Sequence, residues 1–452
     1  QRDVPGILEH LDLVVLATTT HEAFGRGVVE AQAAGVPVVA TKVGGVVDII
    51  EDGKNGLLVP PADDKSMAEA VIRIFKDPKL ARELAQDAYA KVKEKYNVEL
   101  MVKNTLEVYR EVLNNFKILV IKLSSLGDVI LSTAALRALR EKFPQANYKI
   151  SLLIGEESKD ILLRCPYIDE LLVCDLKNKD SGLRGLWKIG QILRKNNFDL
   201  VVDLQNSRSS HALAYLSGCI NRYGYNNKKF AFLLNHTIVD SKLPIDPVTH
   251  QFRVLKMLGI ELLNNALELW LSAEDQKSVD ELLNAQWLSQ AQKVVGINIG
   301  ASKRWLTKLW PLEYVICLCE ELGLKDIRVI ITGTPEDQGV ANMLINSLKN
   351  TKVINACGKT NINELAVIIK KCQVFISADS SPLHIASAVG TPFIALFGPT
   401  DNRRHLPPGK NYMVIDKKIT CSPCYKTKCR TKRCMVAINP AEVFEAVMKL
   451  LK

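Results

Sequence analysis

The chain has 452 residues, of which 47% are hydrophobic and 24% charged, and it carries a formal net charge of +10. This composition excludes a disordered or fibrous chain, and the length predicts about two to four globular domains. No apolar run is long enough to cross a bilayer, and no basic region followed by an apolar stretch opens the chain, so no signal peptide is predicted. The charge favours anionic ligands or an anionic membrane surface without choosing between them.

Residues 1–115 read as a separate α/β unit. The first residues are Gln-Arg-Asp rather than Met, so we expect the sequence to be a piece of a longer protein. Strands are predicted at 11–17 and 37–41, helices at 22–34 and 64–75, and a largely helical, charged stretch at 78–115.

Two further α/β domains are predicted at 116–285 and 286–452, with a polar helical connection at 272–292. Strands alternating with helices predict parallel sheets covered on both faces. Two such domains in series place a ligand cleft between them, at the carboxyl ends of the strands. The predicted strands are 117–123, 148–154, 170–175 and 199–205 in the first domain, and 294–300, 328–333, 352–357, 374–379 and 392–398 in the second.

The stretch from Lys117 to Leu139 is the most informative part of the chain. An apolar run at 118–121 predicts a buried strand, and the loop that follows ends in Asp128, where a helical pattern begins. Open α/β sheets bind ligands at this point, and a carboxylate there can act as a general base. Asp is also a preferred helix N-cap, so the loop alone leaves capping and catalysis open.

Five segments in a fixed order resemble the ADP-heptose:lipopolysaccharide heptosyltransferase family. The resemblance covers residues 116–452 and implies a two-domain GT-B fold with inverting, metal-independent transfer from an ADP-sugar. The segments are KILVIKLSSLGDVILSTAALRALR (117–140), GASKRWLTKLWPLEY (300–314), ITGTPED (331–337), SADSSPLHIASAVGTPFIALFGPTD (377–401) and INPAEV (438–443), which closes a Cys-rich tail.

The resemblance implies roles for single residues. Asp128 matches the family's catalytic base, which takes the proton of the acceptor hydroxyl. Lys308 would offset charge on the leaving diphosphate. The family usually has Lys-Arg-Trp-Pro here, whereas this chain has Leu309 in place of Arg, with Lys303 and Arg304 upstream. Which cation meets the phosphate is therefore left open, and a solvated surface Lys is the alternative.

The remaining donor-binding residues are expected around two strand ends. Asp379 and Ser380 follow a buried strand and open a helix, whose free N–H groups favour anions. Ser381 stands where the family usually has Gly, and His384 is either a ligand contact or a packed structural residue.

Three further donor contacts are expected in two loops near these strands. Thr400 lies in a loop facing the same cleft, and Thr334 and Glu336 follow a strand end where they would meet the donor ribose. Acidic residues are common at helix starts, which is the plain alternative for Glu336.

Residues 1–115 resemble the donor-binding half of retaining, glycogen-synthase-like glycosyltransferases. Glu22 and Glu30 have that family's Glu-x7-Glu spacing, which implies contacts to the sugar and to the nucleotide ribose. Eight residues are about two helical turns, so both side chains are expected on one side of a helix. The acceptor domain and the first strands are missing, so we expect a remnant without activity, because a cleft needs both walls.

Four cysteines near the C-terminus match the spacing of a zinc knuckle with Cys in place of His. That alternative would make the segment a metal or nucleic-acid binder, whereas a reduced or oxidisable structural loop without metal is the favoured interpretation. The neighbouring basic residues would meet an anionic lipid acceptor or membrane, or would form a solvated basic face. The cysteines are Cys421, Cys424, Cys429 and Cys434; the basic residues are Arg403, Arg404, Lys410, Lys417, Lys418, Lys426, Lys428, Arg430, Lys432 and Arg433.

The expected function is transfer of a heptose or similar sugar from an ADP-sugar to a lipopolysaccharide inner-core or related lipid-linked glycan. No cofactor is required and no nucleic-acid partner is expected. Seven other cysteines are scattered through apolar patterns, which favours a reducing compartment and a cytoplasmic enzyme, peripheral at the inner membrane. The alternatives are transfer of another nucleotide-linked sugar by the same fold, and a non-catalytic protein that binds metal or nucleic acid through the Cys cluster.

Overall fold

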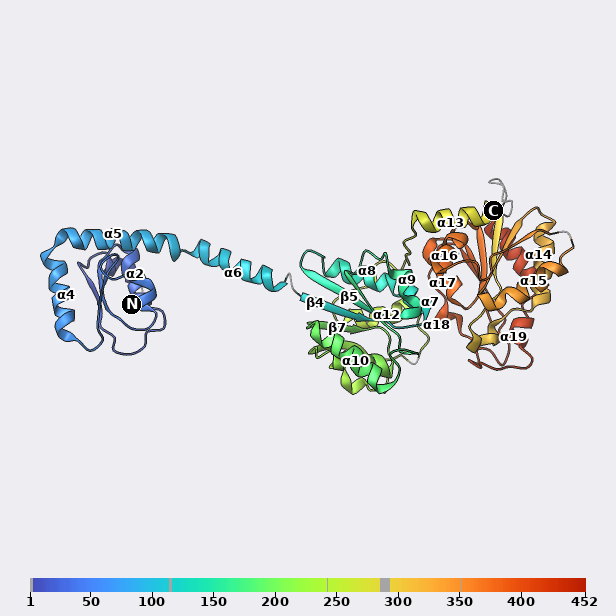
Figure 1. Cartoon of the computed structure of the whole chain (residues 1–452), viewed down its shortest axis with the longest axis horizontal. Coiled ribbons are helices and arrows are strands. Elements are labelled where there is room, and N and C mark those ends of the chain that lie inside the picture. Colours follow the sequence, from blue (N-terminus) through green and yellow to red (C-terminus); the bar gives the residue numbers. More distant parts are fainter. Residues whose placement is uncertain (1–2, 114–115, 242, 285–292, 350) are drawn as a thin grey trace. The chain divides into compact units, whose positions relative to one another are not determined.

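The computed structural model describes residues 3–113, 116–241, 243–284, 293–349 and 351–452. The chain divides into two compact units, one ending at Val112 and one beginning at Leu113, and each is described by itself (Figure 1). The expected boundary between residues 285 and 286 lies outside the described residues.

The first unit is built on a small parallel sheet. The described strands are ordered β1 (Val14–Leu16), β2 (Val38–Thr41) and β3 (Leu57–Val59). Buried Val, Ile and Ala side chains from β2 and the adjacent helices form its core. The helices are α1 (Val4–Leu8), α2 (Arg26–Ala33), α3 (Val46–Ile49), α4 (Asp64–Lys76), α5 (Pro78–Lys95) and α6 (Val98–Leu113).

One expectation about this unit is wrong. Helix α2 begins at Arg26, not at Glu22, because Gly25 before it has a left-handed backbone with φ of 87°. Glu22 therefore lies in the loop ahead of the helix, and only Glu30 is on it. The two carboxylates do not share a helical face.

The second unit begins with a parallel sheet whose described strands have the order β6-β5-β4-β7-β8-β9. The strands are β4 (Phe116–Ile121), β5 (Tyr148–Gly155), β6 (Glu170–Cys174), β7 (Leu200–Asp203), β8 (Asn221–Asn226) and β9 (His236–Val239). The helical segments are α7 (Leu126–Leu131), α8 (Thr133–Lys142), η1 (Glu156–Ser158), α9 (Lys159–Leu162), α10 (Gly182–Lys195), α11 (Arg208–Leu216), η2 (Ala231–Leu233) and α12 (Pro247–Lys256).

The C-terminal half of this unit repeats the same strand order, β12-β11-β10-β13-β14-β15, in its described residues. The strands are β10 (Val294–Asn298), β11 (Arg328–Thr332), β12 (Val353–Asn355), β13 (Val374–Ala378), β14 (Phe393–Phe397) and β15 (Tyr412–Asp416). The helical segments are α13 (Ala273–Asn284), η3 (Lys303–Lys308), α14 (Leu312–Gly323), η4 (Pro335–Asp337), α15 (Gln338–Ser347), α16 (Ile362–Lys371), α17 (Ser381–Val389), α18 (Asn402–His405), α19 (Arg433–Val436) and α20 (Pro440–Leu450).

Both sheets are apolar on two faces, as the continuous hydrophobic runs predict. Helices α10 and α11 cover one face of the first sheet, and α7, α8 and α12 cover the other. The core beneath α7, α8 and α12 continues into α16, α17 and β14. The two halves of the unit therefore share buried apolar side chains. The predicted α/β fold with two Rossmann-like halves is therefore confirmed.

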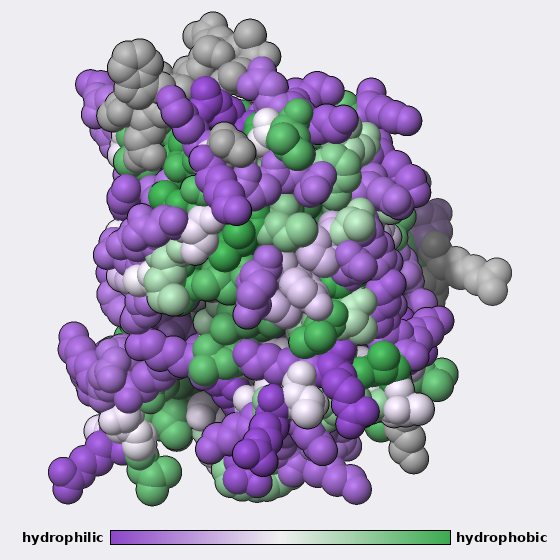
Figure 2. Space-filling model, turned by 90° about the vertical axis from the view of Figure 1, so that its right-hand side faces the viewer, coloured by the Kyte–Doolittle hydropathy of each residue, from purple (hydrophilic) through white to green (hydrophobic). Residues whose placement is uncertain are grey.

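The outer surface is mostly hydrophilic where Figure 2 shows it, with hydrophobic side chains interspersed among polar ones. Among the described helices, none combines the length and the apolar character that crossing a bilayer requires.

Candidate functional site

A cleft of about 1000 Å³ lies where the loops after β4 and β10 face each other in the second unit. In both sheets the strand order reverses beside these strands, which is where open α/β sheets bind ligands. The structure brings every site residue expected in residues 116–452 to this one cleft. They are Asp128, Lys308, Thr334, Glu336, Asp379, Ser380, Ser381, His384 and Thr400.

The N-cap of α7 is Ser125 and not Asp128, which is the third residue of the helix and completes a capping box with Ser125 while remaining an accessible carboxylate. Its Oδ2 accepts hydrogen bonds from the Ser125 backbone N–H at 3.1 Å and the Ser125 hydroxyl at 2.9 Å. The described residues give Oδ1 no hydrogen bond, and the residue is exposed to the cleft. Burial alone would raise the pKa of Asp128, but Lys122, the Ser125 bonds and His384 outweigh it and lower the pKa. The carboxylate is therefore ionised at neutral pH and has one oxygen free to accept a proton.

His384 packs directly against the loop that carries Asp128. A Cβ placed on Gly127 would lie 2.6 Å from the His384 ring, so glycine is needed for α7 and α17 to approach this closely. His384 is 7% exposed, and its Nδ1 has no hydrogen-bond partner among the described residues. Burial is the main reason that its pKa is lowered, although Asp379 and Asp128 oppose the shift. The ring is therefore neutral and serves as a packed contact between the two halves.

Lys308 and Asp379 form a buried ion pair at the cleft wall. Lys308 Nζ lies 2.6 Å from Asp379 Oδ2, and the side chains are 13% and 7% exposed. The Thr400 hydroxyl donates to the same oxygen at 2.7 Å, and Nζ lies 4.8 Å from the centre of the Trp305 ring. Burial would raise the pKa of Asp379, but Lys308, His405 and Thr400 lower it. The structure thus holds the Lys308 ammonium in the cleft by an ionised carboxylate.

The N-terminus of helix α17 lines the same cleft. Ser380 is its N-cap, and Ser381 is its first residue. The Ser380 hydroxyl lies 3.0 Å from the Ser377 hydroxyl and 3.5 Å from Asn298 Nδ2. Such a helix end attracts anions through its free N–H groups and its dipole.

Thr334 and Glu336 also line the cleft. The Thr334 hydroxyl donates to Asp337 at 2.8 Å in a capping box, so it is already engaged. Glu336 is exposed and lies 2.9 Å from Lys303 Nζ. The hydrogen bond from Lys303 is the main reason that the pKa of Glu336 falls to about 2.

Gln205, on the loop after β7, is a residue that the sequence analysis missed. Its Oε1 accepts hydrogen bonds at 3.0 Å from the backbone N–H groups of both Leu123 and Ser124. Lys122 Nζ donates to the Leu204 carbonyl at 3.2 Å. These contacts tie the β7 loop to the loop that leads to Asp128. No sequence spacing signals this role, because the partners lie more than eighty residues apart.

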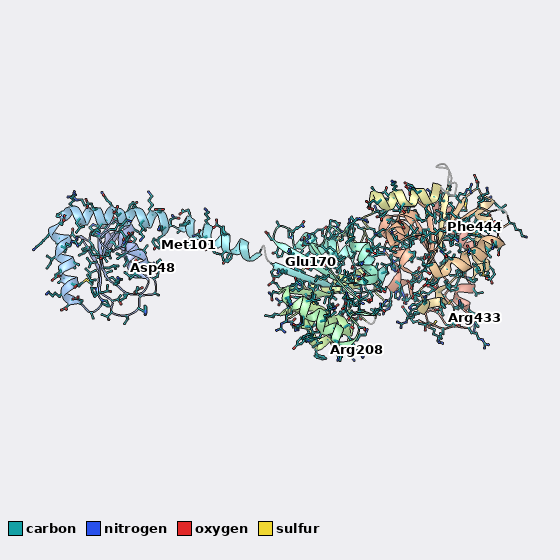
Figure 3. All side chains as sticks on the ribbon, in the orientation of Figure 1. Asp48, Met101, Glu170, Arg208, Arg433 and Phe444 are labelled. Carbon is teal, nitrogen blue, oxygen red and sulfur yellow. The ribbon has the colours of Figure 1, made fainter. Side chains whose placement is uncertain are left out.

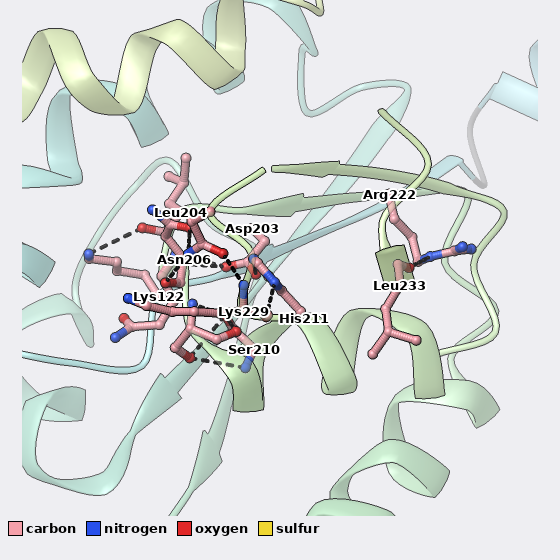
Figure 4. Close-up of polar contacts among 12 residues, drawn as sticks. Lys122, Asp203, Leu204, Asn206, Ser210, His211, Arg222, Lys229 and Leu233 are labelled. Carbon is pink, nitrogen blue, oxygen red and sulfur yellow. Dashed lines mark hydrogen bonds and ion pairs between the residues drawn. The ribbon is translucent and has the colours of Figure 1, made fainter. Parts of the chain in front are cut away.

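A buried polar cluster contacts the backbone of the loop after β7 (Figure 4). Asp203 and His211 are fully buried, with His211 Nε2 3.4 Å from Asp203 Oδ2. The other Asp203 oxygen accepts from the backbone N–H groups of Gln205 and Asn206 at 2.8 and 3.1 Å. Burial is the main reason that the pKa of Asp203 is raised. The cluster therefore fixes the backbone of the loop that presents Gln205.

The Cys-rich loop forms part of the cleft wall. The backbone N–H groups of Cys424 and Tyr425 donate to the Pro399 carbonyl at 3.0 and 2.8 Å, next to Thr400. The Thr307 hydroxyl donates to the Lys426 carbonyl at 2.9 Å, and Tyr425 lines the cleft.

The four cysteines differ in their surroundings. Cys421 and Cys429 are exposed, Cys424 is half-buried and Cys434 is buried. Across the residues that the structure describes, no three His, Cys, Asp or Glu side chains lie close enough to hold a metal ion. This arrangement does not supply the ligand set that the zinc alternative requires.

In the first unit, both glutamates have local partners. Glu22 Oε1 accepts a hydrogen bond from the Gly25 backbone N–H at 3.2 Å, and Glu30 lies 2.7 Å from Arg26. Each side chain is half-buried.

Comparison with known proteins follows the same division of the chain. The profile of glycosyltransferase family 9 (heptosyltransferase) matches residues 186–435, which is more than half of the chain. The chain belongs to this family. A second profile, glycosyl transferases group 1, matches residues 1–91.

Relatives of this glycosyltransferase align with nearly their whole length. A lipooligosaccharide heptosyltransferase 2 of Campylobacter jejuni is 26% identical over 332 residues, which cover 72% of this chain and 96% of the relative. A lipopolysaccharide heptosyltransferase 1 of Campylobacter coli is 28% identical over 351 residues, covering 74% and 98%.

Solved structures show the same fold. A family 9 glycosyl transferase of Veillonella parvula has a TM-score of 0.68 at 24% identity, covering 75% of this chain and 98% of that one. The ADP-heptose lipopolysaccharide heptosyltransferase II of Escherichia coli has a TM-score of 0.61 at 23% identity, covering 74% and 98%. The predicted family and enzyme class are confirmed, and they decide against a non-catalytic protein.

Proposed function

We propose that this glycosyltransferase moves a heptose, or a similar sugar, from an ADP-sugar to a lipopolysaccharide inner-core or related lipid-linked glycan. Transfer inverts the anomeric centre and needs no metal ion or other cofactor. The names of the relatives support the donor and acceptor class. The observation that supports the mechanism most directly is that one cleft contains both the Asp128 carboxylate, with one oxygen free of any described partner, and the Lys308 ammonium, which is fixed by its ion pair with Asp379.

Asp128 is the proposed general base. The acceptor hydroxyl gives its proton to Oδ1, which no described side chain occupies, while the hydroxyl oxygen attacks the anomeric carbon from the face opposite ADP. The bond from that carbon to the diphosphate oxygen breaks, and ADP leaves with the bonding electrons. The lowered pKa of Asp128 keeps the base ionised at neutral pH.

The leaving diphosphate is proposed to lie between Lys308 and the N-terminus of α17. An ammonium and aligned N–H groups stabilise charge that grows on a leaving group, and a fixed position strengthens this effect because little reorganisation is needed. Asp379 and Thr400 would hold the ammonium, while Ser380, Ser381 and His384 shape the floor. Thr334 and Glu336 would meet the ribose, with Glu336 first releasing Lys303.

The acceptor class predicts where the enzyme works. A lipid-linked glycan is presented at a membrane, so we place the enzyme in the cytoplasm, at the surface of the inner membrane. The first unit is proposed not to bind a donor, because its described residues contain no second domain that would close a cleft over Glu22 and Glu30. The Cys-rich loop is proposed to act as a structural wall of the cleft, without metal.

The test is release of a nucleoside diphosphate by the full chain from a panel of nucleotide sugars, with a deacylated inner-core acceptor. We expect ADP from an ADP-heptose, an inverted product by NMR and unchanged turnover in EDTA. Release of a different nucleotide would favour transfer of another sugar by the same fold. A requirement for added Mg²⁺ or Mn²⁺ would contradict the metal-free mechanism.

A further inference from the structure

Helix α10 carries exposed apolar side chains that no described part of the chain covers. Leu183 and Trp187 are 85% and 61% exposed, and they lie four residues apart, on one side of the helix. The opposite side packs into the sheet through Ile189 and Leu193. A helix with a buried apolar face and a second, outward apolar stripe has more hydrophobic surface than folding requires.

A second pair of exposed aromatic residues lies beside the next helix. Phe230 and Phe232 are 46% and 79% exposed, and their ring centres lie 5.9 Å apart. The Arg208 guanidinium, at the start of α11, lies 5.8 Å from the centre of the Phe230 ring. Because α11 packs against both α10 and η2, the two apolar pairs belong to one side of the sheet. Figure 3 shows Arg208 at the rim that α10 occupies in Figure 1.

The same segment is strongly basic. From Gly182 to Val239 the sequence has eight Lys and Arg residues but two acidic ones, Asp199 and Asp203, of which Asp203 is fully buried. Arg184, Lys228 and Lys229 are exposed beside the apolar pairs, while Lys188 is paired with Asp180 at 3.1 Å.

The segment near the C-terminus is also basic, and two of its cations are paired: Arg403 lies 2.8 Å from Asp401, and Lys417 lies 2.6 Å from Glu442. Its large apolar side chains are less exposed, since Tyr425 is 42% and Val436 45% exposed. The surface beside α10 and η2 therefore differs in combining basic charge with strongly exposed apolar side chains.

We propose that this surface, formed by Leu183, Trp187, Phe230 and Phe232 with the basic residues Arg184, Lys228 and Lys229, binds a bilayer of anionic lipid. Exposed Trp, Phe and Leu enter the boundary between headgroups and acyl chains, and Lys and Arg bind the negative surface. Aromatic rings beside basic residues can also stack on the bases of a single-stranded nucleic acid, but Leu183, the most exposed of the four apolar side chains, has no such partner and favours the acyl boundary of a bilayer.

The position of this surface fits a lipid-linked acceptor, and in this respect the inference rests on the proposed function. Helices α10 and α11 begin at the carboxyl edge of the sheet. There a pocket of about 360 Å³ is lined by Lys177, Gln205 and Ser207, and it shares Ser124 with the main cleft. Leu183 lies one residue beyond the start of α10, so a bilayer at this surface lies next to the entrance of the pocket. The acceptor sugar would then reach Asp128 while its lipid remains in the membrane.

The experiment is flotation of the full chain with vesicles of phosphatidylcholine alone or mixed with phosphatidylglycerol, in the absence of donor and acceptor. We expect binding to the anionic vesicles that weakens with added salt. Leu183→Ser/Trp187→Ser should reduce the partition coefficient about tenfold or more. Arg184→Gln/Lys228→Gln/Lys229→Gln should reduce it about a hundredfold, since each basic residue near an anionic surface contributes about a fivefold effect.

Matched controls are exposed residues away from α10 and η2: Leu263 follows α12, Lys142 ends α8 and Lys149 lies on β5. Leu263→Ser removes an apolar side chain that is 91% exposed, and Lys142→Gln/Lys149→Gln removes exposed charge. Both should leave flotation unchanged, and circular dichroism checks that every variant is folded. Equal flotation of wild type and the Leu183/Trp187 variant would overturn the proposal, as would failure of the wild type to float. Loss of RNA binding in these variants without any vesicle binding would also overturn it.

The result is independent of the proposed transfer reaction. With a deacylated acceptor, the Leu183/Trp187 variant should turn over like the wild type, whereas a vesicle-embedded acceptor should reveal a loss. Vesicle binding without any transfer would leave the surface established and would refute the proposed function alone.

Discussion

Replacing Lys308 by Met separates the structural role of this ammonium from its proposed role in binding diphosphate. At the observed 2.6 Å, its attraction to Asp379 is about 6 kcal/mol at an effective dielectric constant of about 20. Loss of one partner of a buried pair typically costs about 3–5 kcal/mol. The Thr400 hydroxyl still bonds Asp379 in the variant, so we expect the free energy of unfolding to fall by about 3 kcal/mol.

The double variant Lys308→Met/Asp379→Asn should recover most of that stability, because the uncompensated buried carboxylate is gone. It should not recover affinity for ADP. We expect ADP to bind about 10–100-fold more weakly to both variants, which corresponds to one lost charge-assisted hydrogen bond.

Two measurements test this reasoning. Urea unfolding followed by tryptophan fluorescence reports on the second unit alone, since all five Trp residues lie beyond Leu113. Calorimetric titration with ADP gives the affinity. Lys303→Met is the control, because Lys303 also pairs with a carboxylate at the cleft but is 84% exposed, so its removal should cost about 1 kcal/mol or less. Unchanged ADP affinity in Lys308→Met, or equal instability of the single and double variants, would refute the reasoning.

Four further changes test other parts of the site. Asp128→Asn should lower turnover about 10²–10⁴-fold with donor affinity unchanged, and near-normal turnover by single-turnover kinetics would exclude Asp128 as the base. Gln205→Ala leaves two backbone N–H groups without their acceptor and should lower turnover about tenfold without changing ADP affinity; a matching loss of ADP affinity would argue for a general structural defect. His384→Gln should flatten the dependence of melting temperature on pH. The lowered pKa of His384 means that the unfolded chain binds a proton below pH 6.5 that the folded chain does not, so the wild type should lose up to about 1.4 kcal/mol per pH unit relative to the variant as the pH falls. Glu22→Gln/Glu30→Gln should leave ADP-sugar transfer per folded molecule unchanged, and abolished transfer by a folded double variant would show that the first unit takes part.

The interior strands could be predicted because their burial on two faces demands continuous apolar runs. Strands β4, β5 and β13 are of this kind. Strands β8, β9 and β15 were not predicted, and they lie toward the sheet edges. The polar side chains of β8, with the sequence NRYGYN, are tolerated because water reaches them, so this strand lacks a continuous apolar run. Strand β15, with the sequence YMVID, has only a short apolar run, which alone does not distinguish a strand from other buried segments.

The candidate site was predictable where a side chain works at its own strand end. Asp128, Asp379 and Thr400 each follow a buried strand, and parallel strands place their ends together. The start of α2 was missed because Gly25 interrupts a pattern that otherwise reads as helical through Glu22. Gln205 was missed because its hydrogen bonds join loops that the topology alone brings together, and no local pattern records them.

The contact between Gly127 and His384 fixes the separation between the proposed base and the loop proposed to bind the donor. Asp128 follows Gly127 directly, and His384 lies three residues after Ser381, so one packing contact fixes both loops at once. A side chain at position 127 would have to displace a buried ring whose surroundings are close-packed, and it would move α7 away from α17. The cost of leaving His384 Nδ1 without a partner is then understandable, since the ring is retained for its shape. The distance between the Asp128 carboxylate and the helix end proposed to bind diphosphate is therefore set by the packing of α7 against α17.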